Sequence, residues 1–239
     1  MEMEKALLIL TLSIASVGFI LWYWISSSLR LPVRYQIMYD ANPAYVYRIL
    51  RRRILGLFIY ALIPLFIIFC THLIQKPTLA DLNISFHWNK EVAIYTVLGV
   101  LLVLVISLVT TPRHSNLEQF PEVRVRFWRP NILIMSALSW IVYIAAYEFF
   151  YRGLLFQSLR FAFENDVLAI AGTTALYSLS HYFKLNRISI SSIFYSVLAC
   201  WVVLQTGSLI PVIVAHTFLT LFVEWLSIKH HREMYILKT

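Results

Sequence analysis

Seven long apolar runs constrain this chain more than any other feature of its sequence. They cover residues 7–25, 54–74, 92–110, 132–150, 167–183, 188–205 and 209–228. A bilayer core about 30 Å thick is crossed by about 20 apolar residues in a helix, which satisfies its own backbone hydrogen bonds where lipid offers none. The runs therefore predict an all-α fold, a polytopic integral membrane helical bundle of about seven transmembrane helices.

The apolar stretch 153–163 leaves the number of helices open between seven and eight. It is too short to span a bilayer. It is expected to be a re-entrant or interfacial piece, or an extension of the fourth helix. The first run is expected to remain in the mature protein, because it is too long for a signal-peptide core and its leader MEMEK is mostly acidic.

Composition excludes an ordinary soluble protein. The chain is 60% hydrophobic and 13% charged, with a mean hydropathy of +0.73, whereas soluble domains carry about 25% charged residues. The net charge of +8 does not indicate nucleic-acid binding. Such binding needs basic residues clustered on a solvated face of a soluble fold, and most of this sequence is apolar. The predicted partner is the lipid bilayer. Cys70 and Cys200 lie inside apolar runs without metal-ligand spacing, so neither a disulfide nor a structural zinc site is expected.

The basic residues predict the orientation. Cytoplasmic loops of membrane proteins are enriched in Lys and Arg. Of the 20 basic residues, 15 fall on one side of the seven runs: Arg30, Arg34, Arg48, Arg51, Arg52, Arg53, Arg113, Arg124, Arg126, Arg129, Lys184, Arg187, Lys229, Arg232 and Lys238. The N-terminus is thus predicted outside and the C-terminus in the cytoplasm. The segment 48–53 is expected to lie against anionic headgroups. Residues 1–239 read as a single membrane domain.

Ionisable side chains inside the apolar runs mark the candidate site, because each costs about 2.5 to 3.5 kcal/mol in lipid unless it is paired or lines a polar cavity. Glu148 and Arg152 are four residues apart, a spacing that favours an ion pair on one helix face. His181 lies near the end of the fifth run. His216 lies in the seventh, with Thr220 and Glu224 on the same face. The alternative is structural: a self-neutralising pair, satisfied histidines, and a solvated Glu224 near a helix end.

One acid and two histidines on three helices form a group that can do chemistry. A carboxylate can take a proton from water while imidazoles hold that water or stabilise an oxyanion. Glu148, His181 and His216 can also be read as three ligands of a divalent metal such as zinc, with an open fourth position. No HExxH motif supports the metal alternative, and the sequence does not choose between the two.

These motifs resemble the CPBP family of intramembrane proteases, which includes the CAAX prenyl endopeptidases and bacteriocin-processing proteins. The family pattern runs Glu-Glu-xxx-Arg, then Phe-xxx-His, then His-xxx-Asn, and the resemblance covers residues 132–228. It implies a helical membrane core with a polar cavity, and a glutamate-activated water that attacks a peptide bond of a membrane or lipid-modified protein. Glu148 matches the second glutamate, Arg152 the arginine, and His181 and His216 the two histidines.

Three positions depart from the family pattern. Tyr147 stands where the first glutamate is expected, Thr220 replaces the asparagine, and Tyr177 replaces phenylalanine. A phenol has an unperturbed pKa near 10 and is a poor general base at neutral pH. Glu148 lies about 100° further round the helix, so it replaces the missing acid only if the helix is rotated or the cavity reshaped. Thr220 lacks the amide donor of asparagine.

The sequence leaves two functions open. One is an intramembrane endopeptidase with a divergent centre at Glu148, His181 and His216. The other is an inactive family member that acts as a membrane scaffold or regulator of a partner protein. A transporter or channel would predict internal pseudo-symmetry or paired helices broken by Gly or Pro. The sequence, with six glycines, has neither feature.

Overall fold

In the computed structural model the chain is a helical membrane bundle, as predicted. The structure describes residues 2–28, 43–70, 78–80, 82–112, 117, 120–181 and 186–237. Among these, five helices are long and apolar enough to cross a membrane, at Glu4–Ile25, Val46–Cys70, Lys90–Thr110, Pro130–Phe163 and Ile210–His230. Two shorter apolar helices, Asp166–Leu179 and Ile190–Thr206, match the fifth and sixth predicted runs.

Three of the long helices contain a π-helical turn. The first consists of α1 (Glu2–Ser13), η1 (Ile14–Gly18) and α2 (Phe19–Ser28), and the second of α3 (Pro43–Leu57), η2 (Phe58–Leu62) and α4 (Ile63–Cys70). The third consists of α7 (Pro130–Glu148), η3 (Phe149–Leu155) and α8 (Phe156–Phe163). Residues 153–163 therefore extend the fourth predicted helix and add no further crossing.

The remaining elements are α5 (Lys90–Thr110), α9 (Asp166–Leu179), α10 (Asn186–Thr206), α11 (Ile210–His230) and the strands β1 (Phe127–Trp128) and β2 (Tyr235–Ile236). Local sequence explains several boundaries. The Asn89 side chain caps α5 by accepting from the Val92 amide at 2.8 Å, and Asn165 caps α9 in the same way. Glu164 takes a left-handed conformation and ends α8.

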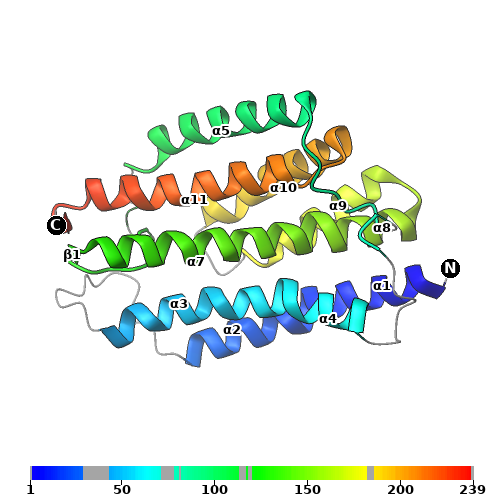
Figure 1. Cartoon of the computed structure of the whole chain (residues 1–239), viewed down its shortest axis with the longest axis horizontal. Coiled ribbons are helices and arrows are strands. Elements are labelled where there is room, and N and C mark those ends of the chain that lie inside the picture. The colour runs from blue at the N-terminus through cyan, green and yellow to red at the C-terminus, as the bar shows by residue number, and fades with distance from the viewer. Residues whose placement is uncertain are drawn as a thin grey trace.

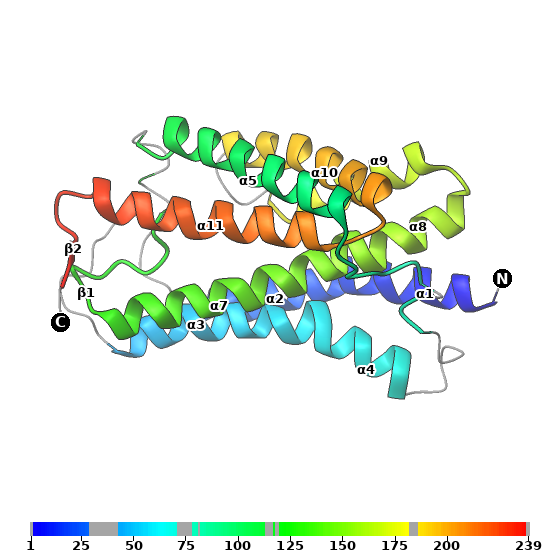
Figure 2. The ribbon, with the colours of Figure 1, turned by 45° about the horizontal axis from the view of Figure 1, so that its top comes forward.

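Figure 1 shows α7 at the centre of the bundle, between α3 and α11, with α5 beyond α11 and with α9 and α10 behind. Helix α1 begins at one end of the long axis and β2 lies at the other (Figures 1 and 2). Glycines permit two close helix contacts. A Cβ on Gly56 would lie 2.2 Å from the Tyr143 ring, and one on Gly99 would lie 3.1 Å from Ala215. These contacts bring α3 to α7 and α5 to α11.

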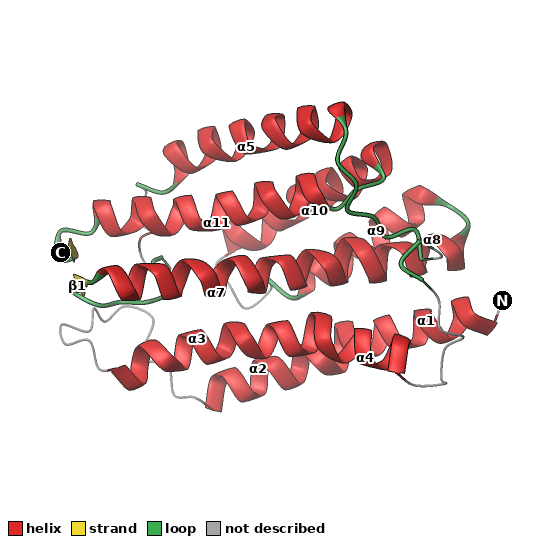
Figure 3. Ribbon diagram, in the orientation of Figure 1, coloured by secondary structure: helices red, strands yellow, loops and turns green. Residues whose placement is uncertain are grey.

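The hydrophobic core has two parts. The larger surrounds η3 and packs α1, α7 and α8 against α9, α10 and the start of α11. The smaller lies at the β-strand end, where Trp128, Met234 and Ile228 pack with residues of α3. There β1 and β2 pair in parallel, with Phe127 opposite Tyr235. Figure 3 shows β1 in yellow at this end of the bundle.

A buried polar cluster joins α3, α7 and α11, and it corrects two expectations. Glu224 is 5% exposed and Arg53 is 2% exposed, so Glu224 is not a solvated carboxylate and Arg53 does not lie against lipid headgroups. Arg53 Nη2 lies 3.2 Å from both Glu224 and Glu122. The Trp140 indole donates to Glu224 at 2.6 Å, and Arg53 stacks over the same ring at 3.8 Å. The donors from Arg53 of α3 and Trp140 of α7 thus take the place of water at Glu224. The basic positions 30, 34, 113, 184 and 238 lie outside the described residues.

Candidate active site

A cavity of about 770 Å³ lies between α2, α3, α5, α7, α9, α10 and α11. Much of its lining is apolar and includes Leu102 and Ile106 of α5. Arg52 and Glu122, whose side chains lie 3.6 Å apart, also line it. Its other polar lining includes aromatic, hydroxyl and imidazole side chains, among them Tyr147, Tyr177, Ser180, His181, Tyr195 and His216. A large, mostly apolar cavity with a few polar groups is typical of a ligand or substrate site.

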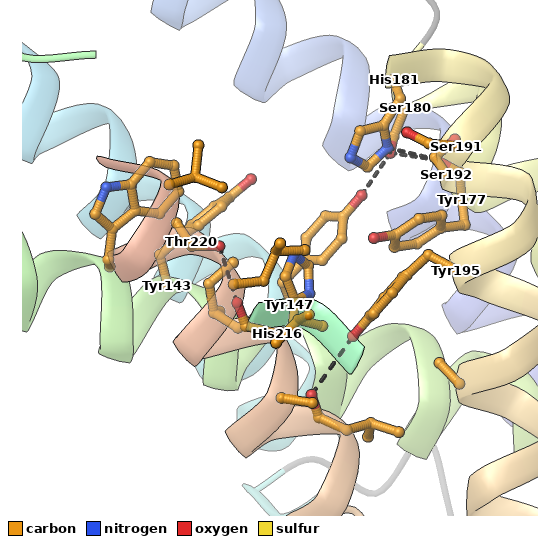
Figure 4. Close-up of a pocket in the computed structure, with 18 of the residues that line it drawn as sticks. Tyr143, Tyr147, Tyr177, Ser180, His181, Ser191, Ser192, Tyr195, His216 and Thr220 are labelled. Carbon is orange, nitrogen blue, oxygen red and sulfur yellow. Dashed lines mark hydrogen bonds between the residues drawn. The ribbon is translucent and has the colours of Figure 1, made fainter. Parts of the chain in front are cut away.

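Tyr147 contacts several of the other polar side chains of the cavity. Its ring contacts the His181 ring at a centroid distance of 6.2 Å and the His216 ring at 6.4 Å, edge-on in both cases, and Figure 4 shows it between the two histidines. The Tyr147 hydroxyl lies 2.5 Å from Ser180 Oγ. Because Ser180 donates its own proton to the Tyr177 carbonyl at 2.6 Å, Tyr147 is the donor in this pair.

Glu148 lies behind the cavity wall. Its side chain is fully buried and is not part of the cavity lining. Oε1 is hydrogen-bonded to His216 Nδ1, and it also accepts from the Tyr195 hydroxyl at 3.2 Å. Oε2 lies 3.3 Å from Arg152 Nε. Both oxygens therefore face partners within the protein.

Arg152 forms the ion pair with Glu148 that the four-residue spacing predicts. It is fully buried in η3, a π-helical turn of the kind often found at functional sites. Its guanidinium carbon lies 4.0 Å from the Tyr177 ring centroid and 5.3 Å from that of Tyr195. The aromatic faces and the Glu148 carboxylate together compensate a cation that lipid and water do not reach.

The two histidines are held through their Nδ1 atoms. Because a carboxylate only accepts hydrogen bonds, Nδ1 of His216 is the donor to Glu148, and in the neutral imidazole Nε2 is then the acceptor. Among the described residues, His216 Nε2 has no hydrogen-bond partner. His181 Nδ1 lies 3.0 Å from the Tyr177 carbonyl and 3.1 Å from Ser180 Oγ. Both imidazoles line the cavity.

One family model matches this chain. It is described as type II CAAX prenyl endopeptidase Rce1-like, and it covers residues 129–222. Over this segment the chain is similar to that family. The segment runs from the start of α7 into α11 and contains every predicted site residue. No curated protein and no solved structure matches the chain.

Within residues 129–222, two of the departures from the family pattern, Tyr147 and Thr220, line the cavity. Tyr147, at the expected position of the first glutamate, faces the cavity, whereas Glu148 does not. This agrees with the 100° that separates neighbouring residues on a helix. Thr220 also lines the cavity, and its hydroxyl donates to the His216 carbonyl at 3.0 Å. The Thr220 proton is therefore already used within α11.

The three residues considered as metal ligands do not converge on a metal position. The Tyr147 ring contacts both imidazoles, and the Glu148 oxygens face His216, Tyr195 and Arg152. Within the described part of the chain, no group of three His, Cys, Asp or Glu side chains has a metal-binding arrangement. The donor set does not fit a divalent metal in this arrangement.

Sequence reasoning missed two site residues, Ser180 and Tyr195. Ser180 immediately precedes His181, and its position within the Tyr177–His181 motif was an available signal. Tyr195 gives no such signal, because a tyrosine in an apolar helix is common. Only the fold brings Tyr195 against Glu148 and the His216 ring, whose centroid is 4.8 Å from its own.

Proposed function

We propose that this chain is an intramembrane endopeptidase of the CAAX-protease type, acting on a membrane or lipid-modified protein, with His216 as the base that activates water. The observation that carries the proposal is the hydrogen bond between His216 Nδ1 and the buried Glu148. It orients an imidazole whose ring lines a cavity among membrane-spanning helices. The match of residues 129–222 to the Rce1-like family supports the reaction class.

In this mechanism the Glu148 carboxylate keeps the proton on His216 Nδ1 and leaves the Nε2 lone pair for water. Nε2 accepts a proton as the water oxygen bonds to the peptide carbonyl carbon, and the carboxylate stabilises the imidazolium that forms. The carbon–nitrogen bond then breaks, and the proton passes from Nε2 to the leaving amine. Glu148 is a positioning residue in this mechanism, because it does not touch the substrate.

In the same mechanism, Tyr147 and His181 stabilise the oxyanion. A tetrahedral intermediate needs donors aimed at its oxygen in a site that excludes water. The Tyr147 hydroxyl donates to Ser180 in the absence of substrate, and it lies on the cavity side between the two imidazoles. A phenol is a good donor although it is a poor base. Tyr147 thus contributes in a different role from the glutamate that it replaces.

A scaffold function is the second candidate, and the position of Tyr147 favours it. An aromatic ring fills the space between the two histidines where the family pattern has a carboxylate. In that case Glu148, Arg152 and His216 are retained as a neutralised buried cluster. A stable co-purifying membrane protein would identify such a scaffold, provided that its binding survives loss of Glu148 and His181.

The test compares the terminal peptides of membrane proteins by mass spectrometry. The cells carry the wild type, a deletion, His216→Ala, or the control His230→Ala, which removes an exposed histidine at the end of α11, at matched expression. The endopeptidase predicts that a processed terminus is absent in the deletion and in His216→Ala and present in the other two. Unchanged termini in all four would contradict it and favour the scaffold.

A further inference from the structure

The β1–β2 end of the bundle carries a surface that the cavity chemistry does not use. Its apolar members are strongly exposed: Phe127 at 44%, Tyr235 at 48%, Ile236 at 47% and Leu237 at 37%. Exposed cations precede or follow them in the sequence, namely Arg126, Arg129, Lys229 and Arg232. We call these eight residues the basic-aromatic patch.

Core packing and backbone hydrogen bonds hold the patch in place. Trp128 and Met234, next to exposed patch residues, are buried in the smaller core with Ile228. The Tyr235 and Leu237 amides donate to the backbone carbonyls of Arg126 and Trp128 at 2.8 and 3.0 Å. The Arg126 guanidinium lies 5.4 Å from the Phe127 ring centroid and 5.9 Å from that of Tyr235. A cation and two rings are thereby presented as one ordered surface.

The patch also lies at a defined level of the membrane. Helix α7 begins at Pro130, two residues after β1, and α11 ends at His230, five residues before β2. Both helices are long and apolar enough to span, so the patch is at the depth where a bilayer changes from hydrocarbon to headgroups. Aromatic side chains and Lys or Arg concentrate at that depth in membrane proteins.

We propose that the basic-aromatic patch binds the headgroups of anionic phospholipids, with its apolar side chains at the upper acyl region. Charge complementarity supports this occupant, because Glu233 is the only acidic side chain in residues 126–130 and 229–237. A strand added by a partner protein is a poorer fit, because β1 and β2 are two residues long each and offer few backbone groups for pairing. The binding is independent of the proposed proteolysis.

The test measures thermal unfolding of the full-length protein in detergent, with a dye that reacts with thiols. Cys200 is buried and becomes reactive on unfolding, and the protein carries Cys70→Ser because Cys70 is exposed and would react before unfolding. Dioleoylphosphatidylglycerol is compared with the phosphatidylcholine of the same chains. We expect the unfolding temperature to rise more with the anionic lipid. The difference should shrink in about 0.5 M salt, because salt screens exposed charges.

Two variants, each lacking two positive charges, locate the effect. Arg129→Gln/Arg232→Gln removes half of the four patch cations and should reduce the anionic-lipid shift by about half. Lys5→Gln/Lys90→Gln removes two exposed charges from the starts of α1 and α5 and should keep the full shift. Equal shifts with the two lipids, or equal losses in the two variants, would overturn the proposal.

Discussion

Tyr147 and Glu148 are neighbours in sequence, but their side chains have different surroundings. Tyr147 faces the cavity and contacts both imidazoles, whereas Glu148 is sealed behind the wall against Arg152 and His216. The family pattern places the activating acid at position 147. With a phenol there, the proposed mechanism assigns the base to the cavity side of His216, and the retained carboxylate acts through that imidazole.

Tyr147→Phe tests the role of the phenol. The change keeps the ring between the histidines and removes the hydroxyl that donates to Ser180. Loss of one oxyanion donor lowers kcat by about 10²- to 10³-fold in a soluble serine protease, and under the proposed mechanism we expect a slower rate of about this order. The measurement is the rate of appearance of the processed terminus at matched expression.

Tyr143→Phe is the matched control, because Tyr143 also lines the cavity and its ring stacks on Tyr147 at 5.7 Å. It should process at the wild-type rate. If both phenylalanine variants behave alike, the Tyr147 hydroxyl has no special role in the reaction.

At the scale of elements, the apolar runs predict the positions of the helices well, but they do not predict which polar side chains another helix buries. The ion pair of Glu148 with Arg152 follows from spacing on one helix. The contacts of Glu224 with Arg53 and Trp140 do not, because those residues are 171 and 84 positions away. A carboxylate near a helix end looks solvated until another helix is known to cover it. Tyr195 reaches Glu148 for the same reason, through the packing of α10 against η3.

Gly56→Ala tests the close contact of α3 with α7. The added methyl group would lie 2.2 Å from the Tyr143 ring, and such overpacking costs about 1 to 3 kcal/mol. We therefore expect a lower unfolding temperature in detergent, measured by circular dichroism.

Gly172→Ala in α9 is the matched substitution. Its methyl group would meet the end of the Leu159 side chain at 3.2 Å, where a small rotation makes room, and alanine favours a helix by about 1 kcal/mol over glycine. It should leave the unfolding temperature unchanged or raise it. A lower value for Gly172→Ala than for Gly56→Ala would contradict this account of the α3–α7 contact.

For the whole molecule, the fold class and the similarity of residues 129–222 to the Rce1-like family both follow from the sequence, while the position of the cavity does not. Both histidines, Arg52 and Glu122 line the cavity, and its lining comes from helices far apart in the chain. Nothing in a single apolar run distinguishes a residue that faces lipid from one that faces this cavity. The cytoplasmic assignment of the C-terminus stays a prediction from the distribution of Lys and Arg.

The central claim is that this chain itself hydrolyses a peptide bond with water activated at His216. The most direct test reconstitutes the purified full-length protein in liposomes with membrane proteins from cells that lack it, in water enriched in ¹⁸O. We predict a new carboxyl terminus that carries ¹⁸O with the wild type and is absent with His216→Ala. Failure of the folded wild-type protein to produce any labelled terminus, or equal labelling by the variant, would contradict the claim.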